Sequence, residues 1–316
     1  MTIEEICGRF ITGEISSLRS MGDGHINDTY IAETQEGSFV LQRLQRKMDL
    51  SKLEYNYALY SPVFEKNQWL FPEWIRSVEG KYFYTDNAGE NWRMYPFIEG
   101  EIIEPPLTEE LLYECGRGLA RLHGILAEIK EKPRAVYPML HDIKHYRDIY
   151  KKTLAGENLC AENRMPGIEK IIDSRIDRYI CRDYEKQSTV HGDTKIANIL
   201  FRTGKVIAFI DLDTMMTGSC LEDIADCVRS CCLTDGKPDP ASADILMEGY
   251  ESIAFGSMGN IRKELPFVLN KISFELALRY YTDSISITKK FKEKHPGYRL
   301  QRAEQLLESV WPETAD

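Results

Sequence analysis

Alternating apolar and polar residues dominate the first part of the chain, a pattern typical of half-buried strands. Such runs cover residues 15–21, 29–34, 38–44, 73–78, 81–85 and 91–97. Glu36-Gly37 and Glu79-Gly80 separate neighbouring runs and predict hairpin turns. Residues 51–64 are instead amphipathic at helical spacing, and Ser51 is the expected N-cap. The pattern predicts a small antiparallel sheet with one helix.

Beyond residue 100 the apolar spacing changes to that of helices. Thr108 is the expected N-cap of a long helix with apolar positions at 111, 112, 115, 119, 122, 126 and 129. Further helices are predicted over about 141–152, 167–183, 220–231, 240–253, 263–288 and 299–310. Because strands come first and helices follow, the expected fold class is α+β, with a bilobal architecture. The predicted lobes, residues 1–97 and 98–316, join near residues 96–100 and enclose the active site in a cleft.

Composition and charge narrow the class of protein. With 43% hydrophobic and 28% charged residues, the chain of 316 residues has the composition of an ordinary soluble enzyme. It has no apolar run of membrane-spanning length and no signal-peptide pattern, so we expect a cytoplasmic protein without a membrane partner. A net charge of −10 argues against nucleic acid but not against a nucleotide, and it could attract a cationic substrate. The oligomeric state is not determined by these features, and a monomer is compatible with them.

Eight cysteines fit a reducing compartment if they are free thiols. Four of them, Cys220, Cys227, Cys231 and Cys232, gather in one segment without a C-x-x-C pair. A zinc site is one interpretation. Cys227 and Cys231 lie one helical turn apart, however, which favours buried thiols on a helix.

Residues 190–213, VHGDTKIANILFRTGKVIAFIDLD, carry the clearest chemical signal in the chain. Asp193 precedes Asn198 by five residues, and Asp211 follows thirteen residues after Asn198. An oxygen-only set of Asp and Asn suits a hard cation such as Mg²⁺, completed by phosphate and water. Phosphoryl transfer also needs a carboxylate that accepts the proton of the incoming hydroxyl. Asp, Asn and Gly are common in turns, but the combined spacing favours phosphoryl transfer with Asp193 as the catalytic base.

Local turns explain how these residues could meet. Gly192 permits a sharp turn before Asp193, and Thr203-Gly204 predicts a hairpin between two short strands. The expected metal ligands are Asn198, Asp211 and Asp213. Lys195 could neutralise the γ-phosphate, with a surface lysine as the alternative.

A loop with two glycines, GDGHIND, precedes the strand at 29–34. Gly22 and Gly24 would let backbone N–H groups approach phosphate closely, although the loop is neither a GxGxxG motif nor a phosphate loop. The alternative is a structural turn in which Asp28 caps the strand.

The segment HGDTKIANILF, followed by IDLDTMMTG and LEDIADCVRS, resembles the aminoglycoside phosphotransferase and choline kinase superfamily, whose members have a protein-kinase-like fold. Within it the chain is most similar to the N-acetylhexosamine 1-kinases. The segments that carry this narrower resemblance are GDGHINDTY (22–30), FVLQRL (39–44), WRMYPFIEG (92–100) and LALRYYTDSI (276–285). GLARLHG (118–124) is common to the broader superfamily.

The resemblance implies a nucleotide site in the first lobe. FVLQRL lies where many kinase-like enzymes carry a lysine that pairs with ATP phosphates, so Gln42 or Arg43 takes its place. The two side chains point to opposite faces of the strand. Glu54 is the expected partner of the cationic residue, or else a solvated helix charge. Phe97 and Ile98 correspond to the kinase linker that faces adenine.

The resemblance also implies acceptor contacts. His25 and Asn27 would bind sugar hydroxyls or the acetamido group, Asp193 would meet O1, and Arg279 corresponds to an arginine that contacts the sugar. An arginine amid apolar helix positions needs a partner. Asp283, four residues on, offers a purely structural one.

Four nearby residues are expected to support the structure rather than to react. His191 would hold the loop of Asp193, and His123 would pack or cap a helix. Asp223 and Asp226 would support the loop that follows Asp211.

The expected activity is the ATP- and Mg²⁺-dependent phosphorylation of the anomeric hydroxyl of an N-acetylhexosamine, GlcNAc or GalNAc. Residues 1–97 would bind ATP, and residues 98–316 would carry catalysis and the sugar. The alternative enzyme is another small-molecule kinase of the superfamily, for an aminoglycoside, choline or homoserine. A non-catalytic nucleotide-binding regulator is the alternative from a different class, and intact Asp193, Asn198 and Asp211 argue against it.

Overall fold

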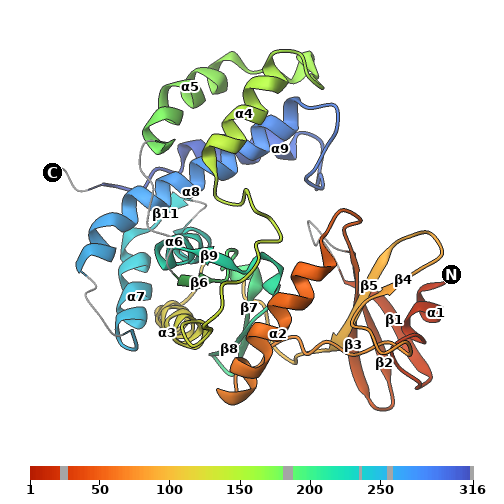
Figure 1. Ribbon diagram of the computed structural model, residues 1–316. Helices are drawn as coiled ribbons and strands as arrows, with labels where there is room; N and C mark the ends of the chain where they lie inside the picture. The colour runs from red at the N-terminus through yellow and green to blue at the C-terminus, as the bar shows by residue number, and fades with distance from the viewer. Residues whose placement is uncertain (22–27, 181–187, 235–236, 255–258, 314–316) are drawn as a thin grey trace. The chain divides into compact units, whose positions relative to one another are not determined.

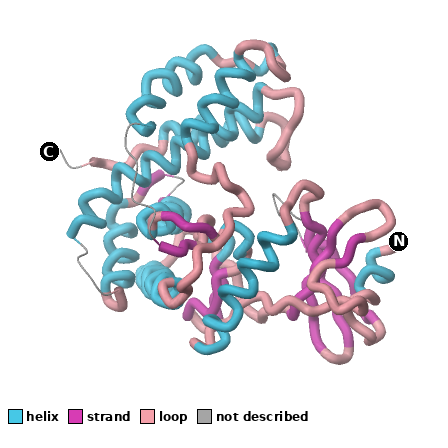
Figure 2. The backbone as a smooth tube through the Cα atoms, in the orientation of Figure 1, coloured by secondary structure: helices cyan, strands magenta, loops and turns pink. Residues whose placement is uncertain are grey.

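The computed structural model describes residues 1–21, 28–180, 188–234, 237–254 and 259–313 (Figure 1). The chain divides into two compact units, Met1–Gly100 and Glu101–Asp316. Strands form the first unit and helices dominate the second (Figure 2), so the predicted α+β fold class is confirmed. The lobe boundary predicted between residues 97 and 98 lies near the end of the first unit, and the roles assigned to the two parts stay predictions.

An antiparallel sheet forms most of the first unit. Its strands are β1 (Ile15–Met21), β2 (Asp28–Thr34), β3 (Gly37–Leu44), β4 (Tyr84–Thr85) and β5 (Asn91–Pro96), in the order β1-β2-β3-β5-β4. The helices are α1 (Ile3–Cys7) and α2 (Leu50–Lys66). The predicted sheet and long helix are confirmed. The short α1 is an addition, which begins where the Thr2 hydroxyl accepts the Glu5 amide at 3.2 Å.

Two details of the prediction for this unit are wrong. Residues 73–78, all of which the structure describes, form no strand, and a single bridge joins Ile75 to Met94. Trp74 instead stacks on Tyr57 of α2, with ring centroids 4.3 Å apart. The cap of α2 is Asp49 rather than Ser51, because the Asp49 carboxylate accepts the Ser51 amide at 3.1 Å.

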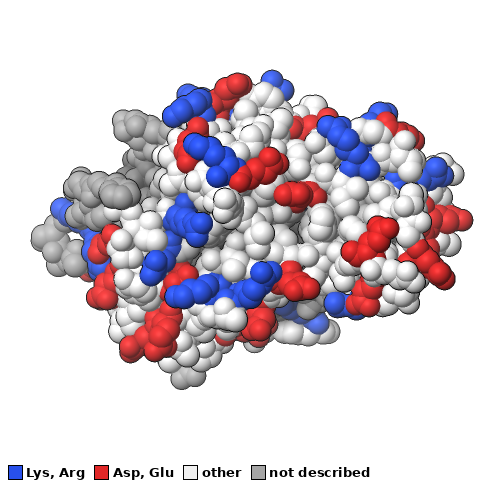
Figure 3. Space-filling model, turned by 90° about the horizontal axis from the view of Figure 1, so that it is seen from below, with Lys and Arg blue, Asp and Glu red and all other residues white. Residues whose placement is uncertain are grey.

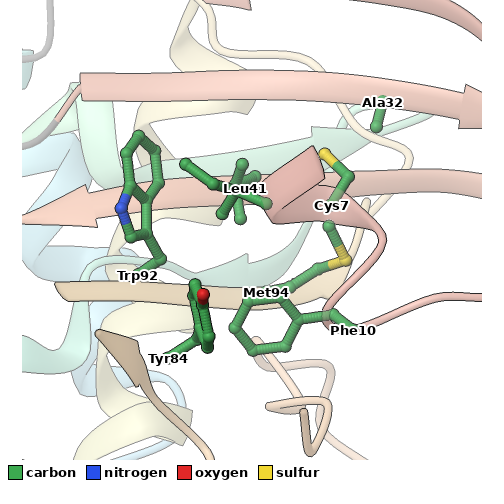
Figure 4. Close-up of a cluster of buried hydrophobic side chains, with 8 residues drawn as sticks. Cys7, Phe10, Ala32, Leu41, Tyr84, Trp92 and Met94 are labelled. Carbon is green, nitrogen blue, oxygen red and sulfur yellow. The ribbon is translucent and has the colours of Figure 1, made fainter. Parts of the chain in front are cut away.

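A buried cluster between α1 and the sheet sets the register of β3 (Figure 4). Its labelled members are Cys7, Phe10, Ala32, Leu41, Tyr84, Trp92 and Met94. Leu41 is fully buried, and a slip of one residue in β3 would turn it out of this core. The register therefore fixes which faces Gln42 and Arg43 occupy, on opposite sides of the strand.

The second unit is built mainly from helices. They are α3 (Glu109–Leu126), α4 (Ile143–Leu154), α5 (Pro166–Ile180), α6 (Cys220–Cys231), α7 (Pro240–Glu251), α8 (Gly259–Ile285) and α9 (Tyr298–Glu308), with single turns at Ala161–Asn163, Ile196–Asn198 and Leu212–Thr214. The described ends lie within four residues of the predicted ends. The predicted residues 181–183 lie outside the described residues. Thr108 caps α3 as predicted, because its hydroxyl accepts the Leu111 amide at 3.4 Å.

Short strand pairs interrupt these helices. The pairs are β6 (Ser188–Val190) with β9 (Met216–Gly218), β7 (Ile199–Arg202) with β8 (Lys205–Phe209), and β10 (Leu233–Thr234) with β11 (Lys237–Pro238). The predicted hairpin turn at Thr203-Gly204 is confirmed, with both residues at positive φ. The cysteine interpretation also holds, since Cys227 and Cys231 are buried with their Sγ atoms 3.8 Å apart.

The surface and the helices give no sign of a membrane segment within the described residues. No helix there is both long and apolar enough to cross a bilayer. On the face that Figure 3 shows, basic and acidic side chains are interspersed. The acidic excess of the chain is therefore not gathered into one patch on that face.

Helices α3 and α7 lie side by side because glycine lets their backbones approach. A Cβ atom at Gly249 would lie 2.0 Å from the Tyr113 carbonyl oxygen. A Cβ atom at Gly118 would lie 2.6 Å from the side chain of Val206 on β8. These contacts position the β7–β8 hairpin, and with it the predicted site, against α3.

Gly249→Ala is expected to lower the free energy of unfolding by about 1–3 kcal/mol, because the new Cβ must push α3 and α7 apart. Gly124→Ala, on the outer side of α3, is the matched control. Nothing lies within 4 Å of its Cβ position, and alanine favours helix there by up to about 1 kcal/mol. Urea unfolding measures both variants. Equal stabilities would contradict the close approach of the helices.

Candidate active site

One buried carboxylate holds the loop that begins at His191. Asp223, in the first turn of α6, accepts the backbone amides of His191 and Gly192 at 2.8 Å each. Burial alone would raise the pKa of Asp223, but His123, His191 and the Gly192 amide outweigh it and lower the pKa. Asp223 is predicted to support the loop that follows Asp211, and this detail is wrong, because its carboxylate holds the loop that leads to Asp193.

The turn at Gly192 requires glycine. Its φ is +84°, and a Cβ there would lie 2.7 Å from the Thr214 carbonyl oxygen. The Thr214 hydroxyl also donates to the His191 carbonyl at 2.8 Å. The loop that carries Asp193 and the loop that follows Asp211 are therefore bound directly to each other.

His191 belongs to the same scaffold and does not act as a base. Its ring is fully buried, with Nε2 donating to the Ile210 carbonyl at 3.0 Å and Nδ1 accepting the Asp193 amide at 3.2 Å. These contacts assign the ring proton to Nε2. Burial lowers the pKa of His191, so the ring is neutral at pH 7. The predicted scaffold role is confirmed.

Asp193 is the carboxylate that this scaffold presents. Lys195 Nζ forms an ion pair with its Oδ2, and Asn198 Nδ2 donates to the same oxygen at 2.9 Å. Burial alone would raise the pKa of Asp193, but Lys195 above all, with His191 and Asn198, lowers it. Asp193 is therefore ionised at pH 7 and can accept a hydrogen bond from a hydroxyl. The structure brings these three residues together, and their catalytic roles stay predictions.

The β7–β8 hairpin brings Asp211 to this group. The Ile210 amide donates to the Asn198 carbonyl at 2.9 Å, so Asp211 follows directly beside the loop. Asp211 has φ +64° and ψ +53°, a left-handed conformation that is uncommon outside glycine. Burial lowers the pKa of Lys195, but Asp193 and then Asp211 outweigh it and raise the pKa. Asp211 is therefore within electrostatic reach of Lys195.

The donor atoms suit a hard cation. Asn198 Nδ2 is committed to Asp193, so Oδ1 is the atom it would turn to a metal. Asp213 is only 4% exposed, whereas Asp211 is half-buried, so Asp211 is the more accessible carboxylate. Among the described residues no three His, Cys, Asp or Glu side chains gather as a metal site. A cation here would need amide, phosphate or water oxygens as well.

His123 packs behind Asp223, as predicted. Its side chain is buried, Nε2 lies 3.2 Å from Asp223 Oδ2, and Nδ1 lies 2.8 Å from the Tyr250 hydroxyl. Asp226, one helical turn after Asp223, pairs with Arg229 at 2.6 Å. The negative charge of Asp226 also acts on Lys195, the partner of Asp193.

Sequence reasoning missed His141, which lies against the loop that leads to Asp193. Its Nε2 donates to the Gly192 carbonyl at 3.1 Å, and its Nδ1 lies 3.4 Å from the Glu275 carboxylate. Burial alone would lower the pKa of His141, but Glu275, with more distant acids, outweighs it and raises the pKa to about 9. His141 is thus a cation at pH 7. No motif marks it, and its partner comes from the distant helix α8.

The ionic partner of Arg279 is Glu275 rather than Asp283. Its Nη1 lies 3.5 Å from Glu275, and its guanidinium lies 5.0 Å from the Tyr146 ring centroid. Asp283 instead pairs with Arg299 at 2.8 Å, so the alternative of an Arg279–Asp283 pair is wrong. The Arg279 side chain is 27% exposed and available to a ligand.

In the first unit Gln42 and Arg43 both have partners from the sheet. Arg43 forms an ion pair with Asp28. Gln42 Oε1 accepts from Arg93 on β5, at 2.8 and 3.0 Å. Arg93 is 3% exposed and was missed, because its proximity to Gln42 depends on the pairing of β3 with β5.

The other predicted nucleotide residues are less constrained. Glu54 is exposed on α2, and the structure gives it no ion pair with a described residue. Phe97 and Ile98 are half-buried after β5, where the Phe97 amide donates to the Ser38 carbonyl at 2.8 Å. Gly22, Gly24, His25 and Asn27 lie outside the described residues.

Taken together, the fold and this loop define a phosphotransferase with a kinase-like architecture. A model described as "Phosphotransferase enzyme family" matches residues 17–258, and the chain belongs to that family. The homoserine kinase of Gluconobacter oxydans (strain 621H) is 24% identical over 261 residues, which cover 80% of this chain and 78% of that protein. The homoserine kinase of Rhodopseudomonas palustris (strain BisB18) is 25% identical over 242 residues, covering 75% and 71%.

Solved structures show the same fold. An amicoumacin kinase in complex with AMP-PNP, Ca²⁺ and Ami has a TM-score of 0.69 at 12% identity, covering 99% of this chain and 95% of that one. Choline kinase LicA from Streptococcus pneumoniae has a TM-score of 0.63 at 13% identity, covering 97% and 96%. The predicted superfamily and protein-kinase-like fold are thus confirmed.

His141→Gln is expected to destabilise the protein in a pH-dependent manner. The pKa of His141 is raised from about 6.5 to about 9 on folding, so its ion pair contributes fully below pH 6.5. That contribution is lost as the pH rises through 9. The stability difference between wild type and variant should therefore be largest near pH 6 and smallest near pH 10.

Denaturant unfolding across this pH range measures the difference. The exposed His295 provides the control, since His295→Gln should change stability little at any pH. A difference that grows as the pH rises would contradict the assigned His141–Glu275 pair.

Proposed function

We propose that this protein is a kinase that transfers the γ-phosphoryl group of ATP to a hydroxyl of a small molecule. The observation that carries the proposal is Asp193, an ionised carboxylate bound by Lys195 and Asn198 on a loop that Asp223 holds. A carboxylate fixed in this way can bind a hydroxyl and accept its proton during phosphoryl transfer.

Asp193 would orient the acceptor as much as deprotonate it. Its lowered pKa makes it a weak base, so the proton would move late, once the new P–O bond has acidified the hydroxyl. Lys195 is paired with Asp193, and its positive charge would also offset the negative charge of the γ-phosphoryl group. This arrangement needs no activated nucleophile before the phosphate arrives.

Asn198 Oδ1 and Asp211 would hold Mg²⁺, with Asp213 as a further candidate. Bound there, the ion would neutralise the phosphates and fix their orientation. The amicoumacin kinase structure contains AMP-PNP and Ca²⁺, which supports ATP and a divalent cation here.

The first unit would supply the nucleotide contacts. Since Gln42 holds Arg93, and Arg43 is paired with Asp28, we propose Arg93 as a further candidate for the cation that replaces the kinase lysine. The other proposed contacts are Gly22 and Gly24 for phosphate, Glu54 for the cation, and Phe97 and Ile98 for adenine.

Two acceptors are supported by different observations. Homoserine is supported by the names of relatives that align along three quarters or more of this chain. An N-acetylhexosamine is supported by the sequence segments that contain His25, Asn27 and Arg279, and Arg279 is partly exposed. Because relatives aligned over three quarters of the chain weigh more than short segments, homoserine is the first acceptor to test. The sugar is the second.

The test is ADP release with ATP, Mg²⁺ and a panel of homoserine, GlcNAc, GalNAc, choline and an aminoglycoside. ³¹P NMR of the product locates the phosphate. Acceptor-dependent turnover supports the kinase. ATP binding without turnover of any acceptor would favour a nucleotide-binding regulator instead.

Asp193→Asn is expected to lower kcat with the best acceptor by on the order of 10² to 10⁴, because shape is kept while proton acceptance is lost. ATP binding, measured by calorimetry, should survive. Asp177→Asn, at an exposed position on α5, is the matched control and should keep wild-type turnover. Near-wild-type kcat in Asp193→Asn would refute the assignment.

Asp211→Ala is expected to abolish turnover, because the proposed Mg²⁺ loses its most accessible carboxylate. Raising the Mg²⁺ concentration should restore little activity. If the variant keeps Mg²⁺-dependent turnover, Asp213 becomes the better ligand, and Asp213→Ala should then be the inactive variant.

A further inference from the structure

Three arginines from three helices lie near Tyr280 or near one another in the second unit, and we call them the arginine cluster: Arg229 on α6, Arg279 on α8 and Arg302 on α9. Arg279 and Arg302 both act electrostatically on Tyr280, and Arg229 acts on Arg302. Arg302 is half-buried and hydrogen-bonds Gln305 at 3.3 Å. Within the described residues no carboxylate lies at ion-pair distance from it. Burial lowers the pKa of Arg302, and the nearby charge of Arg229 lowers it further. The cluster thus contains a cation without a compensating anion.

Aromatic rings hold this cluster in shape. Tyr280 stacks on Phe291 with centroids 4.3 Å apart, and Tyr298 packs edge-on against Tyr280 at 6.1 Å. The Arg279 guanidinium lies 5.6 Å from the Phe291 ring on the same frame. Such rings position guanidinium groups without neutralising them.

The cluster adjoins the catalytic loop at two points. The Ile196 amide in that loop donates to the hydroxyl of Ser230, the residue after Arg229, at 2.9 Å. On the other side, His141 contacts both the Gly192 carbonyl and Glu275, which in turn pairs with Arg279. The negative charge of Asp193 also acts on Arg229, so the cluster begins within electrostatic reach of the carboxylate that would receive the hydroxyl.

The charges around the cluster do not balance. Asp226 neutralises Arg229, and Glu275 is shared between Arg279 and the protonated His141. Arg302 is left over, in a chain whose net charge is −10. Partly buried like charges repel one another strongly unless an anion joins them. The local excess of positive charge therefore points to an anionic ligand.

We propose that the acceptor of this kinase carries a carboxylate, which Arg302 binds together with Arg279 and Arg229 while Asp193 receives the hydroxyl. The acceptor class is then a hydroxy acid, either an amino acid with a side-chain hydroxyl or a sugar acid, rather than a neutral sugar or a cationic alcohol. Guanidinium groups suit this task because their planar fork matches a carboxylate. The inference rests on the proposed kinase function and specifies its substrate.

The first experiment compares acceptors that differ only at the carboxylate. The pairs are L-homoserine with L-homoserinamide, and N-acetylglucosaminuronic acid with N-acetylglucosamine. We expect kcat/KM for the acid to exceed kcat/KM for the compound that lacks the carboxylate by roughly tenfold or more. A change of that size is expected when a hydrogen bond to a charged group is lost. Equal or better turnover of the compound that lacks the carboxylate would overturn the inference and leave the kinase function standing.

The second experiment tests whether Arg302 causes the preference for the acid. Arg302→Gln should raise KM for the acid roughly tenfold. KM for the acceptor that lacks the carboxylate and KM for ATP should both stay unchanged. Arg302→Lys should retain part of the preference, since it keeps the charge. Arg178→Gln, on the exposed side of α5, is the control and should behave as wild type. If Arg302→Gln instead raises KM for ATP, or affects both acceptors equally, the assignment is wrong.

A binding measurement tests the carboxylate site separately from the kinase function. If no acceptor is turned over, an Arg302-dependent rise in melting temperature with homoserine or the sugar acid would support the carboxylate site and count against the kinase function. The absence of any such rise would overturn the site as well. Should Arg302→Gln fail to fold, Arg279→Gln and the wild-type acceptor pairs decide the question.

Discussion

The two backbone amides that converge on the buried Asp223 carboxylate are the constraint on which the site depends. His191 and Gly192 donate to it at 2.8 Å, and Asp223 lies in the first turn of α6, where the helix dipole favours negative charge. Hydrogen bonds to a buried carboxylate are about twice as strong as those between neutral groups. The loop backbone is therefore fixed before Asp193 makes any contact of its own. The direction of the Asp193 side chain follows from that backbone.

Buried ion pairs extend this constraint to the surrounding helices. Lys271 on α8 pairs with Glu222 on α6 at 2.9 Å, and both side chains are almost fully buried. Glu275, one turn further along α8, pairs with His141 ahead of α4. Such pairs add little stability compared with apolar contacts, but a slip of either helix would leave a charge unpaired. They fix α4, α6 and α8 in register with the loop that they enclose.

Features that depend on neighbouring residues could be predicted from the sequence, and features that depend on distant ones could not. The Thr203-Gly204 turn and the Thr108 cap are local, and both are confirmed. Asp193 and Asn198 share one segment, so their meeting was foreseeable. Residues 73–78 alternate like a strand, yet Trp74 packs on a helix instead. His141 and Arg93 gain their importance only from partners that the fold brings to them, Glu275 and Gln42.

The reaction class depends on residues that are neighbours in the sequence, whereas the choice of acceptor depends on residues from distant segments. The loop proposed as catalytic carries Asp193, Lys195 and Asn198 within six residues, so a relative at 24% identity can share the reaction class. The arginine cluster comes from α6, α8 and α9, so its charge depends on residues outside the segment that carries Asp193. A resemblance in short motifs therefore carries information on phosphoryl transfer but little on what receives the phosphate. In the acceptor that we propose, the charge balance among packed helices is the physical property that would favour a hydroxy acid over a neutral sugar.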